Sequence, residues 1–480
     1  MSTELPAPIH LAYLGASVLF IVGLKFLSSP ASARRGNQIA AVGMLLAVIA
    51  TLLVPGMRIS PALIAALAIG TIAGVWAARG VPMTDMPQMV AILNGLGGGA
   101  AALVSCAEIW RAAHPDAATA LIEALGMSAG QGPRHGASVV ELLGVLIGSV
   151  SFSGSVIAWG KLQGVISEKA IVGAWTRAVN IALVIAILVS GAIAMIAGGG
   201  TALVTFLLAS LAFGVFMVIP IGGADMPVVI SLLNSCTGLA AAATGFSLDN
   251  RALIIAGTLV GASGTLLTRL MCKAMNRSLA NVLFGGFGAG PAPGAPSAAK
   301  AATRPVREIG PDDAAVLFSN IRSLIIIPGY GMAVAQAQHT VREFAEMLAA
   351  KGVDVKYAIH PVAGRMPGHM NVLLAEANVP YTQLFDLDQI NSEFPQADVA
   401  LVIGANDVVN PGARTDASSP IYGMPILDAD KAQHCIIIKR SMNPGFAGID
   451  NPLYYEPKTL MLFGDAKGAV AKIIEALKAM

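Results

Sequence analysis

A glycine-rich loop at residues 329–334 (GYGMAV) has the residue types and the spacing that bind phosphate groups. It follows the apolar run 324–327 and opens a helix-like stretch over 332–351. In such a strand–turn–helix unit the glycines let a pyrophosphate approach the backbone, and the helix N-terminus adds partial positive charge. Val334 is bulkier than the residue usual at its position, so a plain glycine-rich turn is the alternative to the dinucleotide site that we predict.

Two cations and a hydroxyl, residues 439–441 (KRS), follow the buried-type run 435–438. Charge-assisted hydrogen bonds to phosphate are strong, so this cluster suits the 2′-phosphate of NADP(H). An NAD(H) site usually has an acidic residue at the end of its second strand, whereas the second apolar run here, 353–359, is followed by His360. The sequence therefore favours NADP(H) over NAD(H), and a solvated strand end is the alternative.

A third candidate group, residues 404–407 (GAND), follows the apolar run 399–403, where a doubly wound sheet would bind ligands. Asp407 could sense ligand or proton there, or it could close an Asx turn. The Pro-, Gly- and Ser-rich loop 408–425 could be a lid, and Arg365 could contact the pyrophosphate or a partner protein. No residues resemble a nucleophile with its base, and hydride transfer requires none because the nicotinamide carries that chemistry.

The elements that must position these groups are alternating strands and helices. Apolar runs at 323–327, 353–359, 398–403 and 435–438 have helical stretches between some of them. This alternation predicts an α/β Rossmann-like fold, with a doubly wound parallel sheet, over residues 305–480.

The first part of the chain is of a different kind. The chain is 55% hydrophobic and only 12% charged, against about 25% charged residues in soluble domains, and the deficit lies in residues 1–280. A helix crosses a bilayer with about 20 apolar residues, and we identify nine such runs, at roughly 9–27, 37–54, 61–78, 87–106, 138–160, 178–197, 201–221, 227–246 and 252–271.

We therefore predict a polytopic α-helical membrane domain over 1–284 and a Gly/Pro/Ala-rich flexible linker at 285–304, before the C-terminal domain. Residues 1–8 lack a positively charged n-region, so the first run is expected to be a retained span rather than a signal peptide. The formal net charge of +2, without a basic–aromatic patch, gives no case for nucleic acid. Four scattered cysteines predict no metal site.

Charges in the loops predict the orientation of the spans. With an odd number of spans the two ends lie on opposite sides, and the positive-inside rule assigns the side richer in Lys and Arg to the cytoplasm. One side would receive Lys25, Arg34, Arg35, Arg79, Lys161, Lys169, Arg177, Arg269, Lys273 and Arg277, and the other Arg58, Arg111, Arg134 and Arg251. The C-terminal domain is therefore expected in the cytoplasm.

An internal repeat marks the membrane part. Residues 85–87 (DMP) are followed by 93–94 (LN), and 225–227 (DMP) are followed by 233–234 (LN) at the same spacing. A proline in the first turn starts a helix, and an aspartate there complements the helix dipole. At about 1.5 Å per residue, the two asparagines would lie roughly two turns deeper, near the middle of the bilayer.

Polar groups inside the spans are candidates for a proton pathway, because ionisable groups are costly in a bilayer and usually functional there. Glu141 would lie near the outer end of the fifth span, and Asp225 at the inner mouth of the eighth. Neutral candidates can hold water and relay a proton by hydrogen bonds, and they are Asn94, Asn234, Ser153 and Ser155. For the two serines, interhelical hydrogen bonding is an equally good explanation.

Six motifs of this chain resemble those of the β subunit of proton-translocating NAD(P) transhydrogenase, along essentially the whole chain. They are 222–227 (GGADMP), 328–336 (PGYGMAVAQ), 362–369 (VAGRMPGH), 404–407 (GAND), 439–443 (KRSMN) and 464–467 (GDAK). The resemblance implies an oxidoreductase subunit that supplies the NADP(H) domain and most of the membrane helices. Hydride would pass directly from NADH to NADP⁺, and proton entry down its gradient would drive this direction.

The resemblance also implies partners. The NAD(H) site would belong to a separate α subunit, which is consistent with the single fingerprint in this chain. The α polypeptides would add further transmembrane helices. A dimer of such complexes would sit among the lipids of a bacterial inner (cytoplasmic) membrane.

For the site, the resemblance implies a nucleotide on the 329–334 loop under the 408–425 lid. The 2′-phosphate would lie on Lys439, Arg440 and Ser441. Asp407, Arg277 and Asp225 would serve the reaction and its coupling to the membrane. The proton pathway would comprise Asn94, Ser155, Asn234 and Asp225. The cofactor-binding residues would be Gly329, Tyr330, Gly331, Met332, Ala333, Val334, Ala335, Val362, Ala363, Gly364, Arg365, Met366, Pro367, Gly404, Ala405, Asn406, Asp407, Lys439, Arg440, Ser441, Gly445, Phe446, Gly464, Asp465 and Ala466.

Two positions depart from the family pattern. Some members carry a membrane His where this chain has Asn94, and because Asn cannot titrate, either a partner's His faces it or the relay runs through water. Phe446 stands where relatives can carry Tyr, so a hydroxyl near the nucleotide is lost.

A different class of protein would also fit a nucleotide-binding domain fused to membrane helices. It is a channel or transporter gated by a regulatory nucleotide-binding domain. Regulatory domains of that kind usually keep the NAD-type acidic residue and need neither a 2′-phosphate cluster nor a long lid. Residues 439–441 therefore favour the enzyme.

Overall fold

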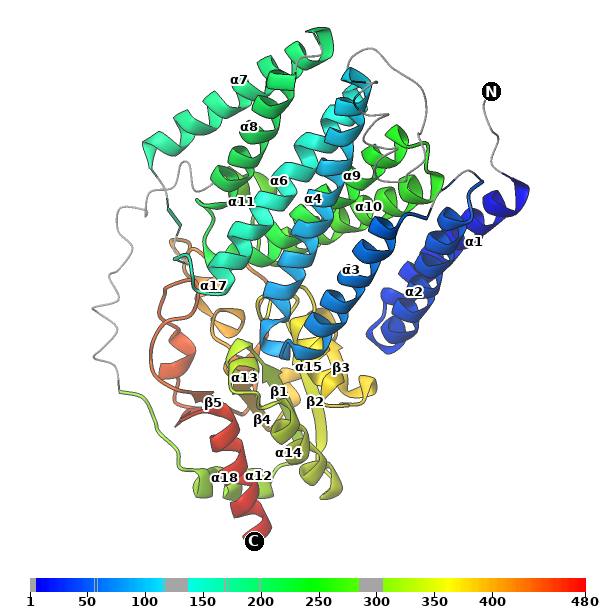
Figure 1. Ribbon diagram of the computed structural model, residues 1–480. Coiled ribbons are helices and arrows are strands. Elements are labelled where there is room, and N and C mark those ends of the chain that lie inside the picture. The colour runs from blue at the N-terminus through cyan, green and yellow to red at the C-terminus, as the bar shows by residue number, and fades with distance from the viewer. Residues whose placement is uncertain are drawn as a thin grey trace. The chain divides into compact units, whose positions relative to one another are not determined.

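The computed structural model describes residues 6–55, 57, 59–114, 117, 137–167, 170, 171, 173–197, 200–284 and 305–480 (Figure 1). The predicted linker 285–304 lies outside the described residues, as do residues 1–5 and the loop cations Arg58, Arg134 and Lys169. The chain forms two compact units. One contains the long apolar helices up to Thr268 apart from Gly223–Val228, and the other contains Gly223–Val228 and the chain from Arg269 onward.

Nine helices in the described part are long and apolar enough to cross a membrane. They are α1 (Ala7–Leu27), α2 (Pro30–Leu52), α3 (Pro61–Gly80), α4 (Met86–Ala113), α6 (Val139–Leu162), α7 (Ala174–Ala197), α8 (Gly200–Val218), α9 (Met226–Ser247) and α10 (Arg251–Ala274). A short helix, α11 (Leu279–Phe284), follows. The nine predicted spans are confirmed.

Two helices extend beyond the predicted spans because their ends are polar. Helix α2 begins at Pro30, with Pro at the start of the first turn and Arg34 and Arg35 on the next, so an apolar window misses this part. Helix α4 continues to Ala113, and the Glu108 and Arg111 side chains form an ion pair one turn apart on its polar last turns.

Helices α4 and α6 lie side by side (Figure 1). Glycines form part of their contact. A β-carbon added at Gly148 would lie 2.5 Å from the Gly98 carbonyl oxygen, and one added at Gly98 would lie 2.9 Å from the Gly148 carbonyl oxygen. Small residues allow such backbone contact between helices in lipid, where burial of apolar surface provides little driving force.

The two copies of the Asp-Met-Pro repeat adopt the same local structure. A 3₁₀ turn, η1 (Met83–Asp85), precedes α4, and another, η2 (Gly223–Asp225), precedes α9. In each copy the aspartate ends the turn, and the proline is the second residue of the helix, where its missing N–H is harmless. The repeat in the sequence therefore corresponds to a repeated helix start.

The C-terminal domain is built on a six-stranded, wholly parallel sheet in the order β3-β2-β1-β4-β5-β6. Its strands are β1 (Ser323–Pro328), β2 (Asp354–Ile359), β3 (Leu384–Asp386), β4 (Val399–Ile403), β5 (His434–Lys439) and β6 (Thr459–Phe463). The order reverses between β1 and β4, which is the switch point where doubly wound sheets bind ligands. The predicted Rossmann-like fold is confirmed.

The helices of this domain cover both faces of the sheet. They are α12 (Pro311–Ser319), α13 (Tyr330–Val334), α14 (Gln338–Ala350), α15 (His369–Glu376), α16 (Leu387–Ile390), α17 (Gly412–Thr415) and α18 (Ala466–Ala479). Successive residues of β1 point to opposite faces, yet Leu324 to Ile327 are all buried. A central strand buried on both faces reads as a continuous apolar run, which explains why the sequence revealed it.

Three features of the domain differ from the sequence prediction. Strand β3 has three half-exposed or exposed residues, so it produced no buried-type run. Strand β6 (TLMLF) is apolar but was not among the predicted runs. The stretch 332–351 is not one helix. Helix α13 ends at Val334, Gln336 adopts a φ of 48°, and α14 begins at Gln338. A positive φ at a non-glycine residue cannot continue a right-handed helix.

Replacing Gly148 by Ala should push α4 and α6 apart, because the new methyl group meets backbone atoms that cannot rotate away. We expect a loss of stability of about 1–3 kcal/mol, seen as a lower midpoint of thermal unfolding of the purified full-length protein. Gly70→Ala is the matched control, since no atom lies within 4 Å of a β-carbon built there. Equal midpoints for the two variants would contradict the packing described here.

Candidate functional site

The candidate site begins where the loops after β1 and β4 touch. The Gly329 N–H donates to the Ile403 carbonyl oxygen, and the Gly331 N–H donates to the Gly404 carbonyl oxygen, both at 2.9 Å. A β-carbon at Gly331 would lie 2.7 Å from the Gly404 Cα, and Gly404 itself has a φ of 64°. These glycines are therefore required by the contact between two loops, and two N–H groups of the predicted phosphate loop are already bonded.

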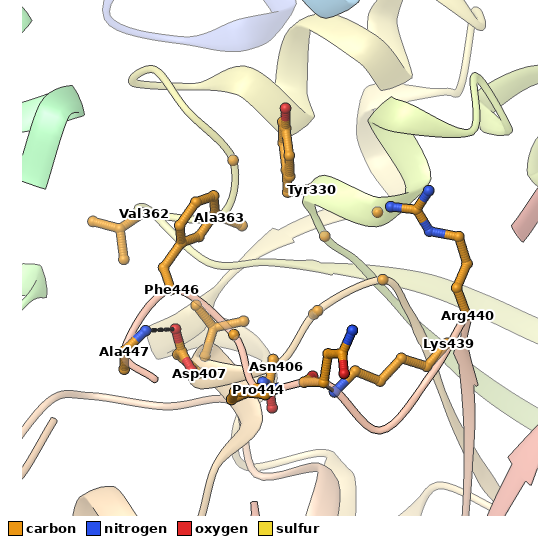
Figure 2. A pocket seen from close by; sticks show the side chains of 18 of the residues that line it. Tyr330, Val362, Ala363, Asn406, Asp407, Lys439, Arg440, Pro444, Phe446 and Ala447 are labelled. Carbon is orange, nitrogen blue, oxygen red and sulfur yellow. Dashed lines mark hydrogen bonds between the residues drawn. The ribbon is translucent and has the colours of Figure 1, made fainter. Parts of the chain in front are cut away.

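A pocket opens at this carboxyl edge of the sheet (Figure 2). It brings together most of the predicted cofactor-binding residues. Those that line it are Gly329, Tyr330, Gly331, Ala335, Val362, Ala363, Gly364, Gly404, Ala405, Asn406, Asp407, Lys439, Arg440, Ser441, Gly445, Phe446, Gly464, Asp465 and Ala466. Met332, Ala333, Val334, Arg365, Met366 and Pro367 are not among the lining residues, and Met332 and Ala333 are fully buried behind it.

The two cations after β5 point in different directions. Lys439 extends toward Asn406 and Pro444, whereas the Arg440 guanidinium extends away from them (Figure 2). The Lys439 ammonium donates to the Asn443 carbonyl oxygen at 2.6 Å and contacts the Tyr454 hydroxyl at 3.3 Å. Burial lowers the pKa of Lys439, against the attraction of Asp407 and Asp450. Side chains of neighbouring residues on an extended chain point in opposite directions. Lys439 and Arg440 are adjacent in the sequence, but their charged groups therefore do not form one cluster.

Asn406 and Asp407 carry polar atoms without partners in the described part of the chain. The Asn406 Oδ1 accepts from the Tyr454 hydroxyl at 2.5 Å and from the Asn451 amide at 3.1 Å, but the Asn406 Nδ2 has no partner there. The Asp407 Oδ1 also has no hydrogen-bond partner there. Both the Asp407 Oδ1 and the Asn406 Nδ2 lie beside Gly445. Buried polar groups normally pair, so these two atoms are candidates for ligand contacts.

The other oxygen of Asp407 joins two loops. The Asp407 Oδ2 accepts a hydrogen bond from the Ala447 N–H at 3.0 Å (Figure 2). Burial raises the pKa of Asp407, although the backbone of Ala447 and the charge of Lys439 act in the opposite direction. The carboxyl group therefore links distant segments rather than closing an Asx turn, and its proton affinity depends on how well the pocket is sealed.

Tyr330 and Phe446, which line the pocket, form an aromatic pair beside the Arg365 side chain. Its guanidinium carbon lies 4.4 Å from the centre of the Tyr330 ring and 5.5 Å from that of Phe446. The two ring centres are 5.8 Å apart. Cation–π attraction of this kind requires only the ring face, so Phe446 supports it without the hydroxyl that a tyrosine would add.

The predicted lid, residues 408–425, has its own packing. Ala413, Ile421 and Met424 form a small buried cluster with Ile426, against Ala447 and Ile449. The Arg414 guanidinium pairs with Asp428 and Asp430 at the base of this segment. Pro420, Ile421 and Met424 also line the pocket, so the lid forms one of its walls.

Comparison with known proteins shows the family of this chain. Residues 9–476 match the model of the family described as NAD(P) transhydrogenase beta subunit. The chain belongs to this family. It is 50% identical over 467 residues, 97% of this chain and 98% of the relative, to the NAD(P) transhydrogenase subunit beta of Rhodospirillum rubrum, and a protein of the same name from a named strain of that organism matches equally.

This transhydrogenase chain is therefore an oxidoreductase subunit and a multi-pass membrane protein. The family name implies nicotinamide nucleotides, and a beta subunit implies an alpha subunit as its partner. The resemblance drawn from the sequence motifs is confirmed.

In the membrane part of the transhydrogenase chain, Asn94 is buried and belongs to a cluster of hydroxyl groups. Its Nδ2 donates to the Ser155 Oγ at 3.0 Å and to the Ser151 Oγ at 3.5 Å. The Ser151 Oγ in turn donates to the Leu233 carbonyl oxygen at 2.9 Å and meets the Thr237 hydroxyl at 2.5 Å. Asn94 and Ser155, two of the predicted pathway residues, are thus joined by a hydrogen bond.

The sequence analysis did not single out Ser151 or Thr237. The signal was present, since Ser151 and Ser155 are four residues apart and lie on one face of α6. Ser153 donates to the Ser149 carbonyl oxygen of its own helix at 3.0 Å. Asn234 is half-buried. In the described part of the chain, the hydrogen bonds between α9 and the hydroxyl cluster are made by Thr237 and the Leu233 carbonyl group, not by Asn234.

The charged candidates of the transhydrogenase chain fall into two kinds. Arg277 donates from Nη1 to both carboxylate oxygens of Asp225, at 2.9 and 2.8 Å, so these two predicted coupling residues are an ion pair. Glu141 instead forms a capping box with Ser138 at the start of α6 and accepts from the Ser247 hydroxyl. Glu141 therefore has a clear structural role.

Lys161 does not lie in a loop, although it was expected among the loop cations. It belongs to the last turn of α6 and is fully buried. Its ammonium donates to the carbonyl oxygens of Ile219 and Ile221, at 2.6 and 2.7 Å, just beyond the end of α8. A lysine at a helix C-terminus satisfies the last carbonyl groups, which a tally of loop charges cannot reveal.

The glycine contact at the start of the site should be sensitive to one methyl group. We expect Gly331→Ala to weaken nucleotide binding and to lower the free energy of unfolding by about 1–3 kcal/mol, because the added carbon meets the Gly404 backbone. Calorimetric titration and thermal unfolding of the full-length protein measure both effects. Gly468→Ala in α18, where a β-carbon meets nothing within 4 Å, is the control, and identical behaviour of the two variants would refute the assignment.

Proposed function

We propose that this chain carries the NADP(H) site of a proton-translocating transhydrogenase. Hydride would pass between NADP(H) here and NAD(H) on the alpha subunit, and proton movement across the membrane would be coupled to this transfer. The observation that carries the proposal is the pocket where the loops after β1, β2, β4, β5 and β6 meet. Membership of the transhydrogenase beta family supports it.

The residues of the pocket fit a dinucleotide. Gly331 and Gly404 place no side chain on that wall, so a pyrophosphate could approach the backbone there. The unpartnered Asn406 Nδ2 and Asp407 Oδ1 offer one donor and one acceptor side by side. When bound, the nicotinamide supplies the hydride chemistry, while the chain's residues orient it and exclude water.

The preference for NADP(H) over NAD(H) rests on charge. Strand β2 ends at Ile359 and is followed by the buried His360, without a carboxylate for a ribose 2′-hydroxyl. Arg440 and Ser441 line the pocket beyond β5. A 2′-phosphate would be held by Arg440 with Ser441, and Lys439 would act from its place against Asn443 and Tyr454.

The remaining assignments concern coupling. Asp407, whose pKa is raised by burial, would respond to closure of the pocket, and the Asp225–Arg277 pair would transmit this state to the membrane helices. Asn94, Ser155 and Asn234 would border a water-based proton path. Because none of these three side chains titrates, the proton-binding group would lie elsewhere, for example on a helix of the alpha subunit.

We place the complex in a bacterial inner membrane, as a dimer of beta chains with their alpha subunits surrounded by lipid. The C-terminal domain would face the cytoplasm, because most loop cations remain on that side after Lys161 is removed from the tally. Proton entry would then drive the reduction of NADP⁺ by NADH.

The deciding experiment uses the full chain and its alpha subunit in sealed vesicles. Hydride transfer from NADPH to an NAD⁺ analogue with a shifted absorbance is followed with and without an imposed proton gradient. We expect transfer only when both subunits are present, with a rate that responds to the gradient. A proton conductance opened by nucleotide in the beta chain alone, without hydride transfer, would instead establish a gated channel.

Arg440→Ala should weaken NADPH binding by about 1.5–3 kcal/mol, the loss of one charge-assisted contact, and should leave the affinity for NADH unchanged. Titration of the full-length protein with each nucleotide measures the difference. Lys478→Ala removes a cation that pairs with Glu343 and is the charge-matched control. NADPH affinity equal to that of the control would remove Arg440 from the 2′-phosphate site.

Asp225→Asn and Arg277→Gln should each lower the gradient-driven rate about tenfold, since each removes a charged hydrogen bond. Hydride transfer without a gradient should persist. Because the residues form one ion pair, the double variant should be no slower than either single variant. Additive losses would show that the two residues act independently, and a fully coupled Asp225→Asn enzyme would exclude this residue from the coupling.

A further inference from the structure

Two buried histidines bracket the loop that follows β2. His360 and His369 stand at the two ends of this loop, residues 360–369, and both are at most 2% exposed. The Val362 N–H donates to the His360 Nδ1 at 3.3 Å, and the Arg365 N–H donates to the His369 Nδ1 at 3.1 Å. Both rings therefore hold the loop by accepting hydrogen bonds from its backbone.

His360 also reaches the lid. Pro425 is the last residue of the lid, and the His360 Nε2 lies 2.8 Å from the Pro425 carbonyl oxygen. A carbonyl oxygen can only accept, so the Nε2 must donate, and the Nδ1 lone pair must receive the Val362 N–H. The two contacts together require the neutral ring with its proton on Nε2. Burial lowers the pKa of His360 to about 4, which agrees with this form.

The two segments joined by His360 are two walls of the same pocket. Val362, Ala363 and Gly364 line it from the loop after β2, and Ile421 and Met424 line it from the lid. His360 itself is not among the lining residues. Its imidazole therefore lies behind both walls and connects them, and the lid cannot swing away while the bond to Pro425 persists.

His369 provides an internal comparison. Its Nδ1 bonds the loop in the same way, and the ring packs against Gly364, where a β-carbon would lie 2.5 Å from that nitrogen. In the described part of the chain, its Nε2 has no hydrogen-bond partner. His369 thus shares the loop contact of His360 and lacks the contact to the lid.

We propose that His360 is a positioning residue that fastens the lid to the loop after β2, and that its bond to Pro425 sets how fast NADP(H) leaves the pocket. This inference rests on the proposed function, because it names the device that retains the nucleotide of that site. The bond itself exists between two parts of this chain, so it can be tested without any nucleotide.

The first test is amide hydrogen exchange of the nucleotide-free, full-length protein. His360→Asn keeps an acceptor near the position of Nδ1 but is too short to reach Pro425. His360→Gln can still donate to Pro425 and loses the Nδ1 acceptor. We expect Asn to speed exchange of the lid amides about tenfold and Gln to speed that of Val362 instead. Equal patterns in the two variants, or unchanged exchange, would overturn the proposal.

The second test measures release of labelled NADPH from the full chain after a chase with unlabelled nucleotide. His360→Asn and His360→Phe should release it about tenfold faster than the unaltered protein, as expected for one lost buried hydrogen bond. His360→Gln should release it at nearly the unaltered rate. His369→Asn is the matched control and should also stay close to that rate.

The outcomes separate the two levels of inference. Accelerated release in His369→Asn equal to that in His360→Asn would reduce both histidines to general supports of the fold and overturn the proposal. Failure of the unaltered chain to bind NADPH would overturn the proposed function, while the exchange pattern would still decide whether His360 fastens the lid.

Discussion

The candidate site depends on the contact of backbone with backbone between the loops after β1 and β4. Gly329, Gly331 and Gly404 lie so close that no β-carbon fits between them, and their hydrogen bonds fix the distance between the two loops. Every other wall of the pocket is placed relative to this contact, because the parallel sheet delivers the remaining loops to the same edge. The glycines resemble a ligand-binding motif, but in this structure they are required for the contact between the two loops.

Much of this architecture could be predicted from the sequence, since its strongest signals are local. The nine spans follow from runs of apolar residues, and β1 and β4 from continuous burial on both faces. Other features depend on contacts between distant residues, and no local pattern carries them. The burial of Lys161 and the bond from His360 to Pro425 both belong to this kind.

The membrane part illustrates how polar groups are accommodated where water is scarce. The Asn94 Nδ2 donates to Ser151 and Ser155, and Ser151 donates to the Leu233 carbonyl oxygen. The Lys161 ammonium donates to two carbonyl oxygens beyond the end of α8. Hydrogen bonds of this kind stabilise helix pairs in lipid modestly, and close packing at glycines adds van der Waals contacts between the helices. The same neutral groups can order water, so a structural role and a role in proton movement do not exclude each other.

The packing of the lid has a thermodynamic consequence. Ala413, Ile421 and Met424 are buried mostly among residues of the lid and its base, and Arg414 ties the segment to Asp428 and Asp430. Such a segment could be released from His360 without losing its own core. Little apolar surface would then change its exposure when the pocket opens or closes, so the heat-capacity change of nucleotide binding would be small and its enthalpy would vary little with temperature.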